Sequence, residues 1–279
     1  MKKTILYIVT LFLLCSISQG YAQKENSKGH HNIKLGVEFG TDFLFGTTRK
    51  PDMVRENKSS YDWFDDHNYY CGFIGDYKAL EITYLGIKPE IFFAKNRIGI
   101  ATGIRLSRYF TTLNSDRNYY LWSVHQDETH TEYIKIRNIK QNSYYLGFPV
   151  EARFFPNKRE LPVQFYLKTG AVFNYRIHTD NKVKFQNPVM ETYAETVRRQ
   201  ADQNLKDFNS YMFLGVGLKV GRFHAGKRKY IPHFNVEVHV LDIMLTDKAS
   251  SFIRANAGFG CQMTVQIPIG KTVPIGSRN

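Results

Sequence analysis

The sequence predicts an all-β protein, an eight-stranded antiparallel up-and-down transmembrane β-barrel with long extracellular loops. Three observations lead to this prediction. The chain opens with an export signal, apolar and polar residues alternate with a period of two in eight segments, and the connections between these segments are short and long in turn. Because successive side chains of a strand point to opposite faces, a period of two indicates strands with one apolar and one polar face.

The N-terminal segment has the parts of a secretory signal. Two lysines precede residues 5–17, which are mostly apolar, and small residues stand at both cleavage positions, Gly20 and Ala22. We therefore expect residues 1–22 to be a signal peptide that is removed, and residues 23–279 to form one barrel domain. The alternative is an uncleaved anchor helix, but the apolar run is shorter than the roughly 20 residues that span a bilayer as a helix.

The eight segments follow one another with little variation in pattern. In the first, Leu35, Val37 and Phe39 alternate with polar or small residues. The next six form three pairs, and each pair is joined by a short connection that predicts a hairpin. The eighth closes the series. The segments are residues 33–45, 80–93, 98–110, 144–155, 163–178, 211–223, 233–240 and 253–267.

The connections orient the predicted barrel. Long connections, residues 46–79, 111–143 and 179–210, follow the first, third and fifth segments, and short ones follow the second, fourth and sixth. The connection after the seventh segment, residues 246–251, is short for an external loop and is neutral evidence. Membrane barrels have short periplasmic turns and longer extracellular loops. With an N-terminus in the periplasm, every long connection lies outside the cell, which agrees with an even number of strands.

The alternation alone does not decide which face is turned inward. A soluble lipocalin-type barrel would place apolar residues inside and charges outside, whereas a membrane barrel has the reverse arrangement. The loop asymmetry and the export signal favour the membrane arrangement. Pro89 and Pro149 lie within segments, and since proline has no backbone donor for the ladder, we expect local bulges at both positions.

Four stretches resemble the outer-membrane β-barrel domain family, small eight-stranded, porin-like and secretion-associated barrels of Gram-negative bacteria. They are residues 143–155, 165–171, 34–37 and 99–103, which read SYYLGFPVEARFF, FYLKTGA, KLGV and GIATG. The resemblance extends over nearly the whole chain after the signal. It implies a barrel in the outer membrane and carries over no catalytic residue and no cofactor. Many such barrels end on an aromatic residue, whereas this chain continues past Ile269 to Asn279.

Charged residues recur on the polar side of the predicted strands. An eight-stranded barrel is filled by side chains, so opposite charges inside it are expected to pair into an internal network. The alternative is a narrow pore, which requires this network to move. The predicted lumen charges are Lys34, Glu38, Asp42, Lys88, Glu90, Arg105, Glu151, Arg153, Lys168, Arg176, Lys219, Glu237 and Arg254.

One group of residues has the composition of an enzyme site. His233, Glu237 and His239 share one face of a predicted strand and could bind a metal or act as an acid and base. Their alternative role is that of ordinary polar residues of the lumen. No serine motif accompanies them, so we expect no catalytic residue, no metal and no cofactor. A lipid A-type hydrolase or acyltransferase remains the enzyme alternative.

The first two long loops are rich in aromatic residues. Exposed aromatic side chains can form a recognition surface, and they can equally belong to the interfacial girdle of a membrane barrel. The candidates for recognition are Tyr61, Trp63, Phe64, Tyr69, Tyr70, Tyr119, Tyr120 and Trp122. We expect a structural or interaction protein that recognises a partner through these loops.

The net charge and the cysteines bound the choice of partner and of covalent structure. Much of the formal excess of +13 lies at predicted periplasmic turns, as at Lys158 and Arg159, so nucleic acid is not an expected partner. Outer-membrane lipid, including lipopolysaccharide, and an envelope protein are expected partners. Cys71 lies in the first long loop and Cys261 on the predicted lipid-facing side of a strand, so no disulfide is expected between them.

Overall fold

The computed structural model describes most of the chain after the N-terminal segment. The described residues are 32–49, 53–55, 78–94, 97–114, 120–125, 131–156, 163–203, 205–221 and 232–269. Several residues singled out in the sequence lie outside these ranges, namely the signal peptide, Cys71, Tyr61, Trp63, Phe64, Tyr69, Tyr70 and Tyr119.

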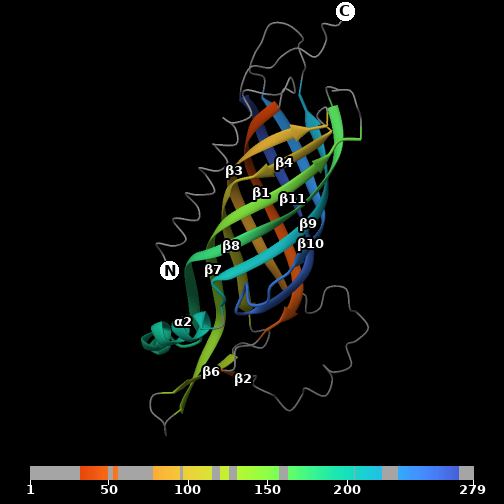
Figure 1. Cartoon of the computed structure of the whole chain (residues 1–279). Coiled ribbons are helices and arrows are strands. Elements are labelled where there is room, and N and C mark those ends of the chain that lie inside the picture. The colour runs from red at the N-terminus through yellow and green to blue at the C-terminus, as the bar shows by residue number, and fades with distance from the viewer. Residues whose placement is uncertain are drawn as a thin grey trace, which may run out of the picture.

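The described strands form a closed antiparallel ring (Figure 1). Each strand pairs with its neighbours in the chain, β7 pairs with β8, and β1 pairs with β11 to close the ring. β4 and β5 occupy one position that is interrupted at Gly103, so the ring has eight strand positions. Its strands are β1 (Asn32–Thr48), β3 (Lys78–Phe93), β4 (Ile98–Thr102), β5 (Ile104–Asn114), β7 (Thr131–Phe154), β8 (Val163–Phe185), β9 (Phe208–Val220), β10 (His233–Met244) and β11 (Ile253–Ile269).

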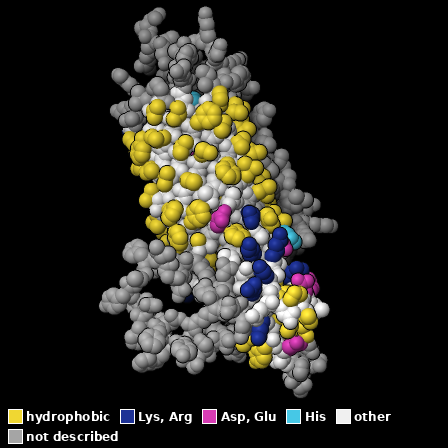
Figure 2. All heavy atoms as spheres, turned by 180° about the vertical axis from the view of Figure 1, so that it is seen from behind, with side chains coloured by type: hydrophobic (Ala, Val, Ile, Leu, Met, Phe, Trp, Pro, Cys, Tyr) yellow, Lys and Arg dark blue, Asp and Glu magenta, His cyan; other side chains and the backbone are white. Residues whose placement is uncertain are grey.

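The apolar side chains point out of the ring and the charged ones point into it. Leu85, Leu106 and Met263 are 56%, 57% and 58% exposed, whereas Glu38 and Arg105 are fully buried. Figure 2 shows the resulting hydrophobic band on one face of the barrel. A band of this kind is unfavourable in water and favourable in lipid. The predicted fold, a transmembrane β-barrel, is therefore confirmed, and the soluble alternative with reversed faces is wrong.

The two prolines do not produce the expected bulges. Leu35 pairs with Pro89 and Pro149 pairs with Val172 without a register shift. The irregularity lies in the strand position between the two prolines, where the ladder is interrupted at Gly103. Pro89 and Pro149 offer no N–H to the strand position that lies between them. In that position a Cβ at Gly103 would lie 2.1 Å from the carbonyl oxygen of Ile87. The strands thus keep their register by interrupting the ladder rather than by adding a residue.

Part of the chain that the sequence assigned to long loops is folded. β7 and β8 have 24 and 23 residues, and at one end of the barrel they continue toward β6 and α2 (Figure 1). Here β7 also pairs with β6 (Tyr120–His125), which pairs with β2 (Val54–Arg55). A 3-10 helix, η2 (Pro188–Tyr193), and a helix, α2 (Ala194–Asp202), follow β8. We call this region the loop-side extension.

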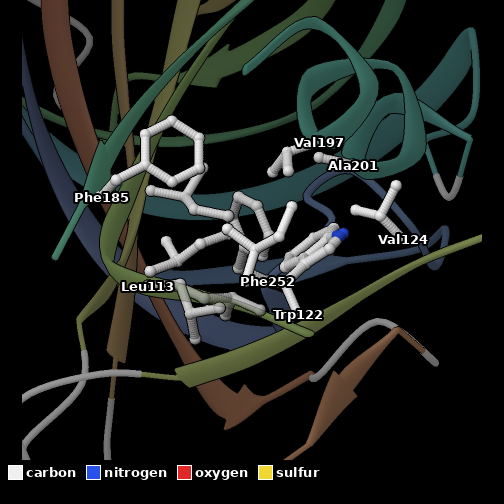
Figure 3. Packing of buried hydrophobic residues seen from close by; sticks show 11 residues of the cluster. Leu113, Trp122, Val124, Phe185, Val197, Ala201 and Phe252 are labelled. Atoms are coloured by element: carbon white, nitrogen blue, oxygen red, sulfur yellow. The ribbon is translucent and has the colours of Figure 1, made fainter. Parts of the chain in front are cut away.

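The loop-side extension has a hydrophobic core of its own (Figure 3). α2 turns Val197 and Ala201, four residues apart, toward the strands, where they join Trp122 and Phe252. Trp122 is fully buried, and its indole nitrogen donates to Oε1 of Gln200 at 2.7 Å. The expectation that Trp122 lies exposed in a recognition loop is therefore wrong, because this side chain anchors the extension. Among the described helices, none is long and apolar enough to cross a bilayer.

Candidate functional site

The middle of the lumen is filled by a charge network that contains equal numbers of acidic and basic side chains. All of its members are at most 1% exposed, and they come from strands on all sides of the ring. Equal numbers matter because an unbalanced charge in a region of low dielectric is costly. The network consists of the carboxylates Glu38, Glu90, Glu151 and Glu237 and the cations Lys88, Arg105, Arg153 and Lys168.

Glu151 of β7 is the hub of the network. Its Oε2 lies 2.5 Å from Nζ of Lys88 and 3.3 Å from Nζ of Lys168, and its Oε1 lies 3.2 Å from Nη2 of Arg105. Arg153, two residues along the same strand, approaches to 3.8 Å. Glu38 extends the network to β1, since Arg105 and Lys88 contact it at 2.7 and 2.6 Å. The carboxylate of Glu151 thus contacts cations from β3, β5, β7 and β8.

Arg153 carries the network to the other side of the lumen. Its guanidinium group donates to Glu90 at 2.8 Å and to Glu237 at 2.7 Å. Glu237 also accepts from Nζ of Lys168 at 2.5 Å and from the hydroxyl of Tyr166 at 2.6 Å. The ring of Tyr166 lies under Arg153, whose guanidinium carbon is 5.4 Å from the ring centre. Each charged group of this half therefore has at least one oppositely charged partner.

Lumen glycines make room for the aromatic rings that accompany the network. A Cβ on Gly217 would lie 2.4 Å from the ring of Tyr166, and one on Gly40 would lie 2.4 Å from the ring of Tyr84. The ring of Tyr84 in turn lies 3.9 Å from the guanidinium carbon of Arg105. Glycine is needed at both positions because any side chain would displace a ring that packs on a charged group.

A second group of ionisable side chains lies beside the network. Asp42 of β1 and His239 and Asp242 of β10 are all fully buried, and one potential ligand atom of each lies within 4.8 Å of the others. His239 Nδ1 is 3.0 Å from Asp42 Oδ1 and 3.6 Å from Asp242 Oδ1. Phe213 stacks on the imidazole at 4.5 Å between ring centres. We call these three residues the Asp–His cluster.

The structure places eleven of the thirteen predicted lumen charges inside the barrel and two elsewhere. Arg176 lies at the mouth, where its Nη2 contacts the exposed Asp207 at 2.6 Å. Arg254 is exposed, because the β1–β11 register shifts next to Asn256 and reverses the faces beyond it. The prediction that Arg176 and Arg254 belong to the lumen network is therefore wrong. The residues inside are Lys34, Glu38, Asp42, Lys88, Glu90, Arg105, Glu151, Arg153, Lys168, Lys219 and Glu237.

The candidate enzyme residues share the lumen face but have separate environments. Glu237 is taken up by the charge network, and His239 belongs to the Asp–His cluster. His233 lies near the turn end of β10, where the chain makes its first ladder pairs with β11. The three residues do not form one constellation, so the proposed acid and base pair has no geometric support. Asp242 is absent from the predicted lumen charges because a register shift between His239 and Asp242 turns its side chain inward, against the period of two.

A basic surface borders the hydrophobic band on the loop-side extension. Lys140 of β7 pairs across the ladder with Lys182 of β8, and both side chains are exposed. Arg137 and Lys184 are exposed on the same two strands. Figure 2 shows Lys and Arg side chains gathered directly below the band, with several acidic side chains beside them. We call Arg137, Lys140, Lys182 and Lys184 the basic face.

These features define the class of protein: a small eight-stranded transmembrane β-barrel whose described lumen is filled by paired charges and whose strands continue into a folded extension. No protein-family model matches the chain, and no curated protein matches it. Among solved structures, the chain is similar to Neisserial surface protein A, with 9% identity and a TM-score of 0.32 over 86% of this chain and 100% of that one.

It is also similar to Ail, the attachment invasion locus protein of Yersinia pestis, whose structure contains the heparin analogue sucrose octasulfate. The identity is 9% and the TM-score 0.28, over 85% of this chain and 97% of that one. The closed strand register and the outward-facing apolar residues establish the fold of this chain independently of these two structures.

Proposed function

We propose that this protein is an outer-membrane barrel with a structural and interaction role, and that its basic face binds the phosphate groups of outer-leaflet lipopolysaccharide. The observation that carries the proposal is the position of the basic face, directly beyond the hydrophobic band on the folded loop-side extension. In this assignment the barrel is a rigid anchor, and recognition is the task of the extension.

The height of the basic face fits a headgroup region. Tyr144 is 42% exposed and is the last outward aromatic residue of β7 before Lys140, which lies four residues further along the strand. Four residues correspond to about 13 Å along a strand, or about 9 Å along the membrane normal at a tilt near 45°. The polar region of each leaflet is about 5–8 Å thick. Lysine side chains can bend back over this difference and reach lipid phosphates.

The pairing of like charges also favours a bound anion. Lys140 and Lys182 are directly opposite each other, and like charges in this arrangement destabilise an antiparallel pair. Asp180, two residues before Lys182, offsets only part of the excess. A phosphate between the two lysines would replace their repulsion with two charge-assisted hydrogen bonds.

The filled lumen argues against the narrow pore. The ion pairs of the charge network cross the barrel from β1 to β10, and their members are at most 1% exposed. Ions could pass only if several buried pairs separated at once. Conductance measurements in planar bilayers test this point directly, and stable single-channel steps would restore the pore hypothesis.

The proposal is tested by exchanging the lipid around the full-length folded barrel. The wild type is reconstituted into vesicles that contain lipopolysaccharide, lipopolysaccharide stripped of its lipid A phosphates, or neither, and its thermal stability is measured by heat-dependent gel mobility. We expect stabilisation only by the phosphorylated lipid. Lys140→Gln/Lys182→Gln should lose it, whereas Lys206→Gln/Lys248→Gln, a double exchange of exposed lysines elsewhere, should retain it.

Equal stabilisation by the two forms of lipopolysaccharide would contradict the role of phosphate. Equal behaviour of the two double variants would contradict the role of the basic face. High salt should weaken the effect in the wild type, since contacts between exposed charges are screened.

A further inference from the structure

We infer that the Asp–His cluster is a binding site for one divalent transition-metal ion of the zinc type, held inside the barrel by Asp42, His239 and Asp242. The inference is independent of the basic face, because it concerns the lumen and a different ligand. Three observations carry it: the unpartnered carboxylate of Asp242, the local charge, and the spacing of the ligand atoms.

Asp242 is the first observation. Its side chain is fully buried, yet neither carboxylate oxygen accepts a hydrogen bond from the described part of the chain. Nε2 of His239 is also without a hydrogen-bond partner there. A buried carboxylate without donors is costly, and such groups are normally paired or bound to a metal. The register shift in β10 that turns Asp242 inward is a local irregularity of the kind often found at functional sites.

The local charge is the second observation. The charge network pairs its own four carboxylates with four cations. The two other lumen lysines, Lys34 and Lys219, lie against Phe92, ten residues along β3 from the partner of Asp42 in the ladder. As metal ligands, two carboxylates and one neutral imidazole carry a charge of −2, which one divalent ion would balance. The set of two carboxylates and one imidazole suits zinc and its neighbours in the transition series.

The third observation is the spacing of the ligand atoms. In a tetrahedral zinc site with bonds of about 2.0–2.1 Å, neighbouring ligand atoms are about 3.3 Å apart. His239 Nδ1 lies 3.0 Å from Asp42 Oδ1 and 3.6 Å from Asp242 Oδ1, so both spacings that involve the imidazole are close to this value. The ligand atoms of the two aspartates lie within 4.8 Å of each other. The remaining oxygen of Asp42 accepts from the hydroxyl of Tyr211 at 3.1 Å, and Arg105 donates to that hydroxyl at 3.0 Å. Such outer hydrogen bonds orient the ligands of a metal site.

Because the cluster is fully buried, the metal must enter while the barrel assembles. The test therefore refolds the full-length chain into detergent micelles after chelator treatment, with or without zinc chloride, and removes excess zinc from the folded product. Zinc content is measured by elemental mass spectrometry, and stability by heat-dependent gel mobility. We expect about one zinc per chain and a raised melting temperature for the wild type refolded with zinc.

Asp242→Asn should bind zinc roughly tenfold or more weakly, and Tyr211→Phe should weaken it as an orienting residue does. Asp207→Asn, the exchange of an exposed carboxylate, is the matched control and should behave as the wild type does. Wild-type zinc content equal to that of Asp242→Asn would overturn the inference, since zinc binding would then not depend on the cluster.

A measurement on the wild type alone keeps the inference testable if the Asp242 variant does not fold. X-ray absorption at the zinc edge should show only nitrogen and oxygen neighbours, with the scattering pattern of one imidazole. A sulfur neighbour would overturn the inference, because Cys261 faces outward and lies outside the cluster. Absence of zinc from the refolded wild type would do the same.

Discussion

Replacing Glu151 by glutamine should destabilise the barrel more than any surface exchange. The change keeps the shape of the side chain but removes the charge that Lys88, Arg105 and Lys168 share at 2.5, 3.2 and 3.3 Å. The network then has one cation in excess in a buried environment. Breaking a buried pair from one side costs about 3–5 kcal/mol. With a urea dependence of about 2–3 kcal/mol per molar, the unfolding midpoint should fall by roughly 1–2 M.

The assay is urea unfolding of the barrel in lipid vesicles, followed by heat-dependent gel mobility and by far-ultraviolet circular dichroism. Two controls separate charge balance from general damage. Asp207→Asn breaks the exposed contact with Arg176 and should cost no more than about 1 kcal/mol. Glu151→Gln/Lys168→Met removes one charge of each sign. Its loss in free energy of unfolding should be about 1–3 kcal/mol smaller than the sum of the losses of the two single exchanges.

The comparison between the single and the double variants decides the matter. If the effects of the two single exchanges simply add in the double variant, the charges of Glu151 and Lys168 are not coupled, and the reasoning is refuted. A loss for Glu151→Gln no larger than that for Asp207→Asn would refute it as well.

Three further changes test other parts of the structure. Gly217→Ala should cost about 1–3 kcal/mol in urea unfolding, since the added methyl group would push the ring of Tyr166 off the charge network; an unchanged midpoint would contradict the close packing. Trp122→Ala should open the loop-side extension at a cost of about 3–5 kcal/mol, seen as faster limited proteolysis, while heat-dependent mobility shows the barrel still folded. Partial burial raises the pKa of Asp202, although Asn181 donates a hydrogen bond to its carboxylate at 2.7 Å. The stability that protonated Asp202 contributes is therefore fully present below the usual carboxyl pKa and is lost as the pH rises through the raised pKa. Asp202→Asn should abolish this pH dependence of proteolysis of the extension, and a pH profile identical to that of the wild type would count against it.

The strands and their faces could be predicted from the sequence because both depend on local pattern. Apolar residues such as Leu85 and Leu106 alternate with lumen residues such as Arg105, and the period of two alone assigns them to opposite faces. Which face is turned outward could not be read from this pattern. It depends on whether the charges find partners in the lumen, and that requires the three-dimensional register of strands far apart in the sequence.

The candidate site was predictable only where the strands are regular. Two register shifts reverse the alternation locally, one beside Asn256 and one between His239 and Asp242. The first turns Arg254 outward and the second turns Asp242 inward, so a strict period of two gives the wrong face for both. A bulge adds one residue without a clear sequence signal, and its position is set by the pairing with neighbouring strands.

The loop-side extension was missed for a different reason. Residues 131–143 and 179–185 continue their strands, but their apolar side chains pack on α2 and β6 instead of on lipid or the lumen. The period of two is therefore masked by a change of environment along the same strand. Trp122 illustrates the change, since an aromatic residue in a long connection suggests exposure, and only the contact with Gln200 and α2 explains its burial.

The distribution of charge inside the barrel explains why an interaction with the surroundings has to involve the outside. The network ties β1, β3, β5, β7, β8 and β10 together through buried ion pairs, so a change of conformation in the lumen would expose several unpaired charges to a low dielectric at once. The loop-side extension has no such constraint, because its core is apolar and its outer face carries unbalanced basic residues. Conformational adjustment and ligand binding thus cost less free energy on the extension than in the lumen. The Asp–His cluster agrees with this division, because a metal ion trapped there during assembly would stiffen the barrel further and leave recognition to the extension.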